Sequence, residues 1–531
     1  MADPSLHSLR AQLELDDDSL ARLGYVDPDQ QAAAGAIIDD FLAREVRDRG
    51  YILKRVKRGL ANRSAGLGMR EQPAPLEEAV DAREKDAIKG LEKARSSMQT
   101  LLRSPIAVAG ALMPDASPAG SEEAAMPVGG VLATRNAIVP AATGLDIACS
   151  LQATFYVGEA SVSEELDALV ESTRFGPGGR AEGERIAHPV THEPVWENGF
   201  LKGLRSFAEA HIADQGDGNH FAFLGEVEVS DGLLSAWERS GHSSLAAGTR
   251  HCGARSLRVL VTHHGSRGLG AQVFKRGMKV AVKATRKLAG DIPENASWLA
   301  LESDEGKEYW DALQYVERWT QANHSAIHSG FLDRIAQKLL GRLDTTHNFL
   351  WRRGDRILHG KGATPAWPMA DGAPRLGLIP LNLAAPILIT AGGNAADYLG
   401  FAPHGAGRHV SRTRYRERLY RQGRQNVVET LRQQLEALAS AVETRWYLGE
   451  PDLGEFPLAY KNPHEIERAI ARFQLATVVA TIRPRGTVMA GSRPRAGDEP
   501  EPLTPKQRRQ LEHRAERRKQ KQRRLNPWDN E

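Results

Sequence analysis

From about Pro105 onward, apolar residues occur in short runs that glycines interrupt. Examples are Pro127–Ala133, Arg258–Thr262 and Leu376–Thr390. Short apolar runs bounded by glycine turns predict buried strands, and functional residues commonly lie in the turns that follow such strands. We therefore expect the sheets and the functional residues in this part of the chain.

Helical patterns accompany these strands. Residues 1 to about 75 are acidic and then basic, and Pro75–Ser104 is charged; both stretches are helix-prone. Nearer the C-terminus, five apolar residues recur at spacings of three and four, namely Val428, Leu431, Leu435, Leu438 and Val442. This spacing predicts one apolar helix face, of the kind that packs against a core.

These patterns divide the chain into three parts. We expect a helical N-terminal lead-in over residues 1–104 and a large domain over residues 105–491. The stretch SRPRAGDEPEP after Gly491 predicts a linker, so residues 492–531 are expected to form a linker and a basic tail. No internal repeat is evident.

The net charge of +3 is unevenly distributed. The stretch from Lys506 to Arg524 has ten Lys or Arg against two glutamates, a local charge of +8, so the rest of the chain carries about −5. Such a run is typical of a solvated helix or tail, and it is also suited to contacting RNA or a ribosome through phosphates. Because no aromatic residues interleave with it, it could add affinity but no sequence readout.

Cysteine usage and hydropathy indicate the compartment. With only two cysteines, Cys149 and Cys252, we expect no disulfide framework, and this usage fits a reducing cytoplasm. The first twenty residues are acidic rather than basic and then apolar, so we expect no signal peptide. The most apolar run, Leu376–Thr390, is broken by two prolines and an asparagine, so we expect a core segment rather than a membrane span.

Two histidine–glycine motifs carry the strongest chemical signal, HHGSRG at His263–Gly268 and HGAGR at His404–Arg408. Glycine allows close approach of a ligand to the backbone, arginine offers a planar fork for phosphate, and histidine binds metal or attacks phosphorus. The chain also contains DIAC at Asp146–Cys149 and GNHF at Gly218–Phe221. Together the motifs indicate a metal site that handles phosphate.

The candidate metal ligands are a carboxylate, a thiolate and three imidazoles, namely Asp146, Cys149, His220, His263 and His347. A turn through DIAC could direct its Asp and Cys at one ion, and a metal-bound thiolate is a strong ligand. Each histidine taken singly fits a hydrogen-bonded structural residue equally well, and Cys149 alone fits a small core residue. Spacing does not decide between these interpretations.

Six motifs together resemble the RtcB family of RNA ligases. They are GGVLATRNAIVPAATGLDIACS, GNHF, HHGSRGLGAQV, THN, HGKGAT and HGAGRHVSR, and they occur in the family's order and approximate spacing over about residues 105–490. The resemblance implies an α+β fold with one large catalytic domain containing mixed sheets. It further implies joining of an RNA 3′-phosphate or 2′,3′-cyclic phosphate to a 5′-hydroxyl, with GTP and two Mn²⁺ ions.

The resemblance also assigns roles to residues. Cys149 would bridge two ions, with Asp146 and His220 completing one site and His263 and His347 the other. His404 would be the nucleophile that takes GMP as a phosphoramidate. Six residues would support the nucleotide or its phosphates, namely Asn219, Asn348, Lys361, Asp397, Arg408 and Ser411. On donor type alone we would expect zinc, because Mn²⁺ prefers oxygen ligands, whereas the resemblance favours Mn²⁺.

Cys252 has no counterpart in the family, and we expect its side chain to be buried in the core.

Several positions depart from the family pattern around the nucleotide. Phe223 replaces a glutamate, and Gly360 and Pro365 replace two arginines of RKGATR. The family's GSMGTASY segment reads AGGNAADY at Ala391–Tyr398, so that Gly392 and Asp397 replace serines, although Asp397 could still accept a hydrogen bond from guanine. The terminal lysine of PLGVxKG is replaced by Met489 or Ala490. These changes predict a weaker preference for guanine.

The chain therefore resembles a divergent paralogue, and we expect a cytoplasmic ligase that repairs broken RNA, with tRNA or rRNA ends as substrates. An accessory activator protein is a further candidate partner. Two other functions stay open: a metal-dependent phosphodiesterase that opens cyclic phosphates without ligation, and a non-catalytic RNA- or ribosome-binding protein. Retention of His404 argues against the first alternative, and retention of five candidate ligands argues against the second.

Overall fold

The structure is a computed structural model, and it describes residues 4–62, 68–82, 84–120, 123–289, 291–410, 412, 414–415 and 442–493. Contacts divide the chain into two units, Met1–Gly491 and Ser492–Glu531. Three predicted features lie outside the described residues: Ser411, residues 428–441 of the amphipathic helix, and the basic stretch that begins at Lys506.

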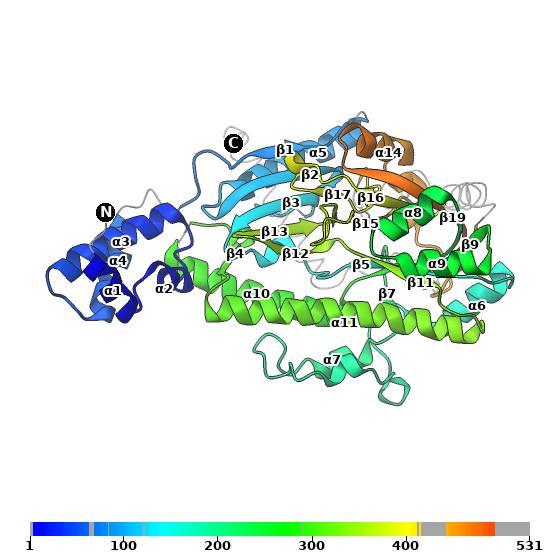
Figure 1. Ribbon diagram of the computed structural model, residues 1–531, viewed down its shortest axis with the longest axis horizontal. Helices are drawn as coiled ribbons and strands as arrows, with labels where there is room; N and C mark the ends of the chain where they lie inside the picture. Colours follow the sequence, from blue (N-terminus) through cyan, green and yellow to red (C-terminus); the bar gives the residue numbers. More distant parts are fainter. Residues whose placement is uncertain are drawn as a thin grey trace, which may run out of the picture. The chain divides into compact units, whose positions relative to one another are not determined.

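The largest sheet of the first unit has eight strands in the order β11-β5-β9-β8-β19-β16-β15, with β18 paired to β19 (Figure 1). Only the β18–β19 pair is parallel. The predicted run Arg258–Thr262 is confirmed as part of β9, and the run Leu376–Thr390 forms two strands joined by a turn at Asn382. The strands are β5 (Ser150–Tyr156), β8 (Phe221–Glu228), β9 (Ser256–His264), β11 (Gly341–Thr346), β15 (Leu376–Pro380), β16 (Ile387–Gly392), β18 (Glu443–Trp446) and β19 (Ala476–Met489).

A second sheet has the order β1-β2-β3-β13-β12 and is antiparallel except for its β1–β2 pair. Its strands are β1 (Leu76–Glu78), β2 (Ala107–Ser117), β3 (Val128–Arg135), β12 (Asn348–Arg353) and β13 (Arg356–Lys361). The predicted strand at Pro127–Ala133 is confirmed as β3. Three small pairs complete the sheets: β14 (Ala363–Pro365) with β17 (Phe401–Pro403), β4 (Ala137–Ile138) with β10 (Leu299–Ala300), and β6 (Arg174–Phe175) with β7 (Asp214–Gly216).

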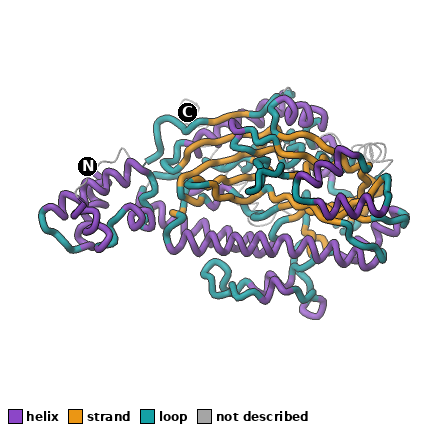
Figure 2. Tube along the Cα trace, viewed as in Figure 1, coloured by secondary structure: helices purple, strands orange, loops and turns teal. Residues whose placement is uncertain are grey.

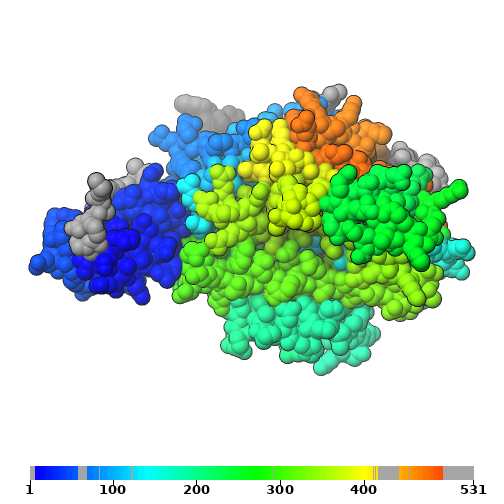
Figure 3. Space-filling model, in the orientation of Figure 1, coloured from blue at the N-terminus to red at the C-terminus, as the bar shows by residue number. Residues whose placement is uncertain are grey.

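Helices cover both faces of the eight-stranded sheet (Figure 2). On one face, α8 (Asp231–Arg239) and α9 (Ser243–Cys252) bury Trp237 and Leu245 against strand residues such as Phe155, and they form the green surface in Figure 3. On the other face, α6 (Val162–Ser172) and the long α11 (Asp304–Arg334) bury Leu166 and Phe331. Helix α10 (Arg267–Leu288) lies beside α11. Helices combined with mixed sheets confirm the predicted α+β class.

The N-terminal helices have a hydrophobic core of their own. They are α1 (Pro4–Gln12), α2 (Asp17–Arg22), α3 (Pro28–Ala43) and α4 (Arg49–Asn62), and their core includes Leu20, Ile38 and Ile52. The next helix, α5 (Lys85–Leu102), packs against β2 instead. The predicted boundary at residue 104 thus falls between two elements in contact. Within the described part of the chain, no helix is long and apolar enough to cross a membrane.

Candidate active site

The predicted ligands gather at one end of the eight-stranded sheet. His263 of β9 lies opposite both Leu151 of β5 and Phe221 of β8. Cys149 comes directly before β5, and its carbonyl accepts a hydrogen bond from the backbone N–H of His347, which follows β11 (3.0 Å). Because neighbouring antiparallel strands alternate in direction, the starts of β5 and β8 meet the ends of β9 and β11. Residues far apart in sequence therefore share one small volume.

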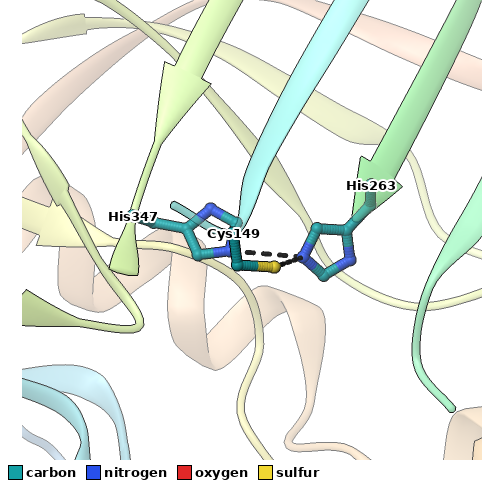
Figure 4. Close-up of side chains that lie close together, drawn as sticks. All are labelled: Cys149, His263 and His347. Atoms are coloured by element: carbon teal, nitrogen blue, oxygen red, sulfur yellow. Dashed lines mark hydrogen bonds between the residues drawn. The ribbon is translucent and has the colours of Figure 1, made fainter. Parts of the chain in front are cut away.

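Cys149, His263 and His347 point toward one another (Figure 4). Nε2 of His263 lies 3.2 Å from Sγ of Cys149 and 3.2 Å from Nε2 of His347. Both imidazoles are buried, and each Nδ1 lacks a hydrogen-bond partner. Burial lowers the pKa of His263 to about 3 and holds the pKa of His347 well below its usual value. Both rings are therefore neutral, which is the form that binds metal.

A second group adjoins the first. Nε2 of His220 lies 3.0 Å from Oδ2 of Asp146 and 3.8 Å from Sγ of Cys149. Burial tends to raise the pKa of Asp146, but attraction to His220 outweighs it and the pKa is lowered. A Cβ atom at Gly265 would lie 1.9 Å from Oδ1 of Asp146, so only glycine fits beneath this carboxylate. This close approach explains why the first glycine of HHGSRG, Gly265, has no side chain.

Cys149 belongs to both groups. Within each group the donor atoms lie within 4.8 Å of one another. Burial and the neighbouring Asp146 raise the pKa of the Cys149 thiol, so a cation is needed to ionise it. The donor set and its geometry therefore fit two cations that share one thiolate.

His404 lies in the same cavity, directly after β17, with its ring centroid 4.9 Å from that of His347. Its Nδ1 is 2.5 Å from Oδ2 of Asp115, and its backbone N–H donates to the same oxygen (3.3 Å). A carboxylate that accepts from Nδ1–H fixes the tautomer in which Nε2 carries the lone pair. Asp115 is fully buried in β2, and the sequence interpretation missed it. The sequence feature that could have identified Asp115 is a single acidic residue within the otherwise mainly apolar segment ALMPDAS.

The cavity has a volume of about 360 Å³, and four of the predicted nucleotide residues line it, namely Asn219, Asn348, Lys361 and Arg408. The amide of Asn348 accepts from the N–H of Gly362 (2.7 Å) and donates to the carbonyl of Asp146 (3.2 Å). Nζ of Lys361 donates to the carbonyl of Met126 (2.9 Å), and burial lowers the pKa of Lys361 to about 8.

Arg408 packs within a polar cluster that the sequence did not predict. Its guanidinium lies over the ring of Tyr460 (4.9 Å to the centroid) and donates to the carbonyl of Gly454 (2.5 Å). Buried Glu455 binds Arg412 at 2.8 Å and accepts from the Tyr460 hydroxyl. Both arginines are thus held in place beside the cavity.

One wall of the cavity is apolar. It consists of Phe221, Phe223, Leu381, Leu383, Ile387 and Met489, which we call the apolar wall. Strand pairing places Phe221 opposite Met489 and Phe223 opposite Thr487. The Thr487 hydroxyl donates to the carbonyl of Ala222 (3.3 Å). Among the described residues that line the cavity, the only carboxylates are those of Asp146 and Glu455, and both already have partners.

The structure places two predicted residues away from the cavity and corrects the expectation for one of them, Cys252. Asp397 is exposed in a short 3-10 turn after β16 and is not among the cavity-lining residues, so its role at the nucleotide stays a prediction. Nor does Gly392 of the AGGNAADY segment line the cavity. Cys252 is exposed rather than buried, since it ends α9 just before Gly253; its thiol lies 3.1 Å from the carbonyl of Thr249. The thiol of Cys252 is free, as is that of Cys149.

The chain is similar to known proteins across this region. A sequence model of the family described as tRNA-splicing ligase RtcB matches residues 196–490. The tRNA-splicing ligase RtcB of Pyrococcus horikoshii is 28% identical over 353 residues, which are 60% of this chain and 38% of that protein. That of Thermococcus kodakarensis is 24% identical, over 71% of this chain and 86% of that protein. The RNA-splicing ligase RtcB1 of Escherichia coli is also 24% identical, over 67% and 85%.

These matches differ in coverage. The chain spans less than half the length of the Pyrococcus horikoshii protein and most of the length of the other two. The family match covers more than half of the chain, including His220 directly before β8 and the strands that carry His263 and Met489. The chain therefore belongs to the RtcB family.

Proposed function

We propose that this protein is an RNA ligase that joins a 3′-phosphate or 2′,3′-cyclic phosphate end to a 5′-hydroxyl end through a guanylylated His404. Broken tRNA or rRNA ends are the proposed substrates, with an accessory activator as a candidate partner. The proposal fits the names of the relatives, which are tRNA-splicing and RNA-splicing ligases.

One observation carries the proposal. The thiol of Cys149 is shared by two ligand groups, and His404, held by Asp115, lies beside one of them. A nucleophilic imidazole next to a pair of cation sites is suited to phosphoryl transfer rather than to simple structural metal binding.

Five residues would hold the two cations, namely Asp146, Cys149, His220, His263 and His347. Two Mn²⁺ ions would neutralise phosphate charge during an in-line displacement. The buried neutral imidazoles and the glycine beneath Asp146 support this assignment.

His404 would act first. Its Nε2 lone pair attacks the α-phosphorus of GTP, the bond to the bridging oxygen breaks, and pyrophosphate leaves. The proton on Nδ1 stays on the imidazole and is stabilised by the Asp115 carboxylate. Lys361 and Arg408 offer positive charge to the phosphates along the same cavity.

RNA would react in two further steps. An oxygen of the RNA 3′-phosphate attacks the phosphorus on His404, which breaks the N–P bond and transfers GMP to the RNA. The 5′-hydroxyl of the second RNA then attacks the 3′-phosphate, forming the new phosphodiester and releasing GMP. A cyclic phosphate end first takes up water and opens to a 3′-phosphate.

The apolar wall favours one second candidate function. A cavity with no unpaired carboxylate for the N–H groups of guanine suits a phosphodiesterase that opens cyclic phosphates and needs no nucleotide. The described residues carry no feature that favours a non-catalytic RNA- or ribosome-binding role over an enzymatic one, and the basic tail lies outside them.

Incubation with GTP and Mn²⁺ followed by intact-mass analysis tests the proposal. We expect one GMP adduct on His404 and none on His404→Ala, while His251→Ala, an exposed histidine of α9, keeps the adduct. An adduct on another residue would refute the nucleophile. No adduct from either GTP or ATP, with metal shown to be bound, would favour the phosphodiesterase.

A further inference from the structure

Two guanidinium groups lie over a single indole ring outside the cavity. The Cζ atoms of Arg353 and Arg375 are 5.1 Å and 5.6 Å from the ring centroid of Trp367. Trp367 is itself buried and packs edge-on against Trp351 and Phe401. We call Arg353, Trp367 and Arg375 the arginine–tryptophan cluster. Cation–π contact holds each guanidinium but uses none of its N–H donors, which therefore stay available.

The cluster has excess positive charge. Among the described residues, no carboxylate forms an ion pair with either Arg353 or Arg375, and the buried Nε of Arg375 has no hydrogen-bond acceptor. Burial and the nearby charge of Arg353 lower the pKa of Arg375. The charge of Glu317 opposes this decrease in the pKa of Arg375. Burial raises the pKa of Glu317 itself, and its carboxylate accepts a hydrogen bond from the Thr346 hydroxyl (3.3 Å).

An exposed arginine adds to this charge. Arg356 lies opposite Arg353 across the β12–β13 pair, and both side chains are exposed. Like charges held this close repel one another unless an anion sits between them. The cluster therefore has the composition of an anion site, with planar forks that suit phosphate.

Two strands connect the cluster to the cavity. Strand β12 begins at Asn348, which lines the cavity, and ends at Arg353. Strand β15 begins directly after Arg375 and ends at Pro380, which also lines the cavity. At about 3.3 Å per residue, either strand places the cluster about 17 Å from the cavity.

We propose that the arginine–tryptophan cluster binds a backbone phosphate of the RNA strand whose end occupies the cavity. At a stacked rise of about 3.4 Å per nucleotide, the separation corresponds to about five nucleotides. Because Trp367 is buried beneath the guanidiniums, no aromatic face is open for base stacking, so the contact positions RNA without reading its sequence. The inference rests on the proposed function for the choice of RNA as the ligand.

The test compares short and long RNA on the full chain. Fluorescence anisotropy measures binding of a 3′-phosphorylated dinucleotide and of an oligonucleotide of about twelve nucleotides. The variants are Arg353→Gln and Arg353→Glu, which alter an exposed side chain away from the cavity. The matched control is Arg483→Gln, an exposed arginine of β19 paired with Glu228 (2.8 Å).

We expect Arg353→Glu to weaken binding of the long RNA about tenfold, and Arg353→Gln to reduce its log K versus log salt slope by about 0.7. Affinity for the dinucleotide and the melting temperature should not change, and Arg483→Gln should behave as the unaltered protein. An equal loss for both RNA lengths, or no loss for either, would overturn the inference.

Two further measurements are needed. One distinguishes inorganic phosphate from RNA as the ligand of the cluster, and the other distinguishes this inference from the proposed function. Inorganic phosphate bound at the cluster, with long-RNA affinity unaltered by Arg353→Glu, would overturn the assignment to RNA. GTP labelling of His404 is measured in parallel. A length-dependent loss supports the cluster even if His404 takes no nucleotide, and its absence overturns the cluster even if His404 is labelled.

Discussion

Asp115 is the residue that fixes the orientation of the His404 ring. It is fully buried, and one of its oxygens accepts from both the Nδ1 and the backbone N–H of His404. The carbonyls on either side of it, those of Pro114 and Ala116, accept from Nζ of Lys461 (2.9 Å each). Lys461 thus fixes the backbone on both sides of Asp115, while Oδ1 of the carboxylate is buried without a hydrogen-bond partner among the described residues.

We expect Asp115→Asn to slow labelling of His404 by GTP roughly 100- to 10,000-fold, because an amide can stabilise the wrong tautomer and cannot neutralise the imidazolium that develops. Quenched-flow labelling followed by mass analysis measures the rate. Asp355→Asn, an exposed carboxylate next to Arg135 (3.4 Å), serves as the control. An unchanged rate in Asp115→Asn would show that the carboxylate does not act through His404.

Cys149 offers a second test at this scale. Because its sulfur belongs to both ligand groups, we expect Cys149→Ala to lose both ions and all ligation while the fold stays largely intact. His263→Ala should likewise lose ligation. Metal content measured by mass spectrometry should fall to near zero in Cys149→Ala. The natural control is Cys252→Ala, which removes the exposed thiol. Full ligation at unchanged metal demand would contradict the two-ion assignment.

Lys361 predicts a pH dependence. Burial lowers its pKa to about 8, so its positive charge is complete well below that pH and is lost as the pH rises through about 8. We expect GTP affinity, measured by calorimetry with Mn²⁺ present, to fall over this window. Lys361→Arg should flatten the decline because a guanidinium stays charged. Equal pH profiles for the two proteins would assign the titration to another group.

At the scale of elements, the proposed function makes the β8–β19 pair a candidate contact for the base of the nucleotide. Phe223 and Met489 contribute apolar side chains to the apolar wall from these two strands. Apolar contact discriminates between similar ligands by only ~1–3 kcal/mol, whereas hydrogen-bonded sites discriminate far more strongly. The pair therefore predicts a weaker preference for GTP over ATP than the family pattern would give.

We expect Phe223→Glu to raise the GTP-to-ATP ratio of adduct formation roughly tenfold or more, since a carboxylate can accept from the two N–H groups on the edge of guanine. Phe223→Leu, which keeps the wall apolar, should leave the ratio unchanged. Labelling with each nucleotide separately gives the ratio. A strong preference for GTP in the unaltered protein would show that another group reads the base.

Some of these features could be predicted from the sequence and others could not, for physical reasons. The strands at Pro127–Ala133 and Arg258–Thr262 were predictable because each is a short apolar run with glycines within it or shortly after it. The proximity of the five candidate ligands was predictable only through the resemblance of whole motifs to a family, because the spacing of single residues did not decide between a metal site and structural roles. Asp115 and Glu455 were missed because their partners, such as His404 and Arg412, are distant in sequence, and only the tertiary fold brings them together.

Asp397 shows the limit of a resemblance between motifs. The resemblance places it beside the nucleotide, whereas in the structure it is exposed in a 3-10 turn after β16 and is not among the residues that line the cavity. Its role at the nucleotide stays a prediction. The path of this segment is set by backbone hydrogen bonds to residues distant in sequence, such as that from Gly393 to Leu475, and motif order does not reveal such contacts.

For the whole molecule, the uneven charge leads to a prediction about RNA. The stretch from Lys506 to Arg524 has a local charge of +8, and it offers phosphate neutralisation without a catalytic group. We expect deletion of residues 506–531 to weaken RNA binding and to flatten its salt dependence, with an unchanged single-turnover joining rate on bound RNA. Identical log K versus log salt slopes with and without the tail would show that it is no RNA anchor.

The pairing of β8 with β19 also governs how the site can form. Thr487 bonds to Ala222 across 265 residues of sequence, and this strand pair closes one wall of the cavity. Contacts of such long sequence separation pay a large loop-closure cost and slow folding. Refolding should therefore produce locally paired strands well before any nucleotide can be held. The complete cavity should therefore form late in folding, only after β19 has paired with β8.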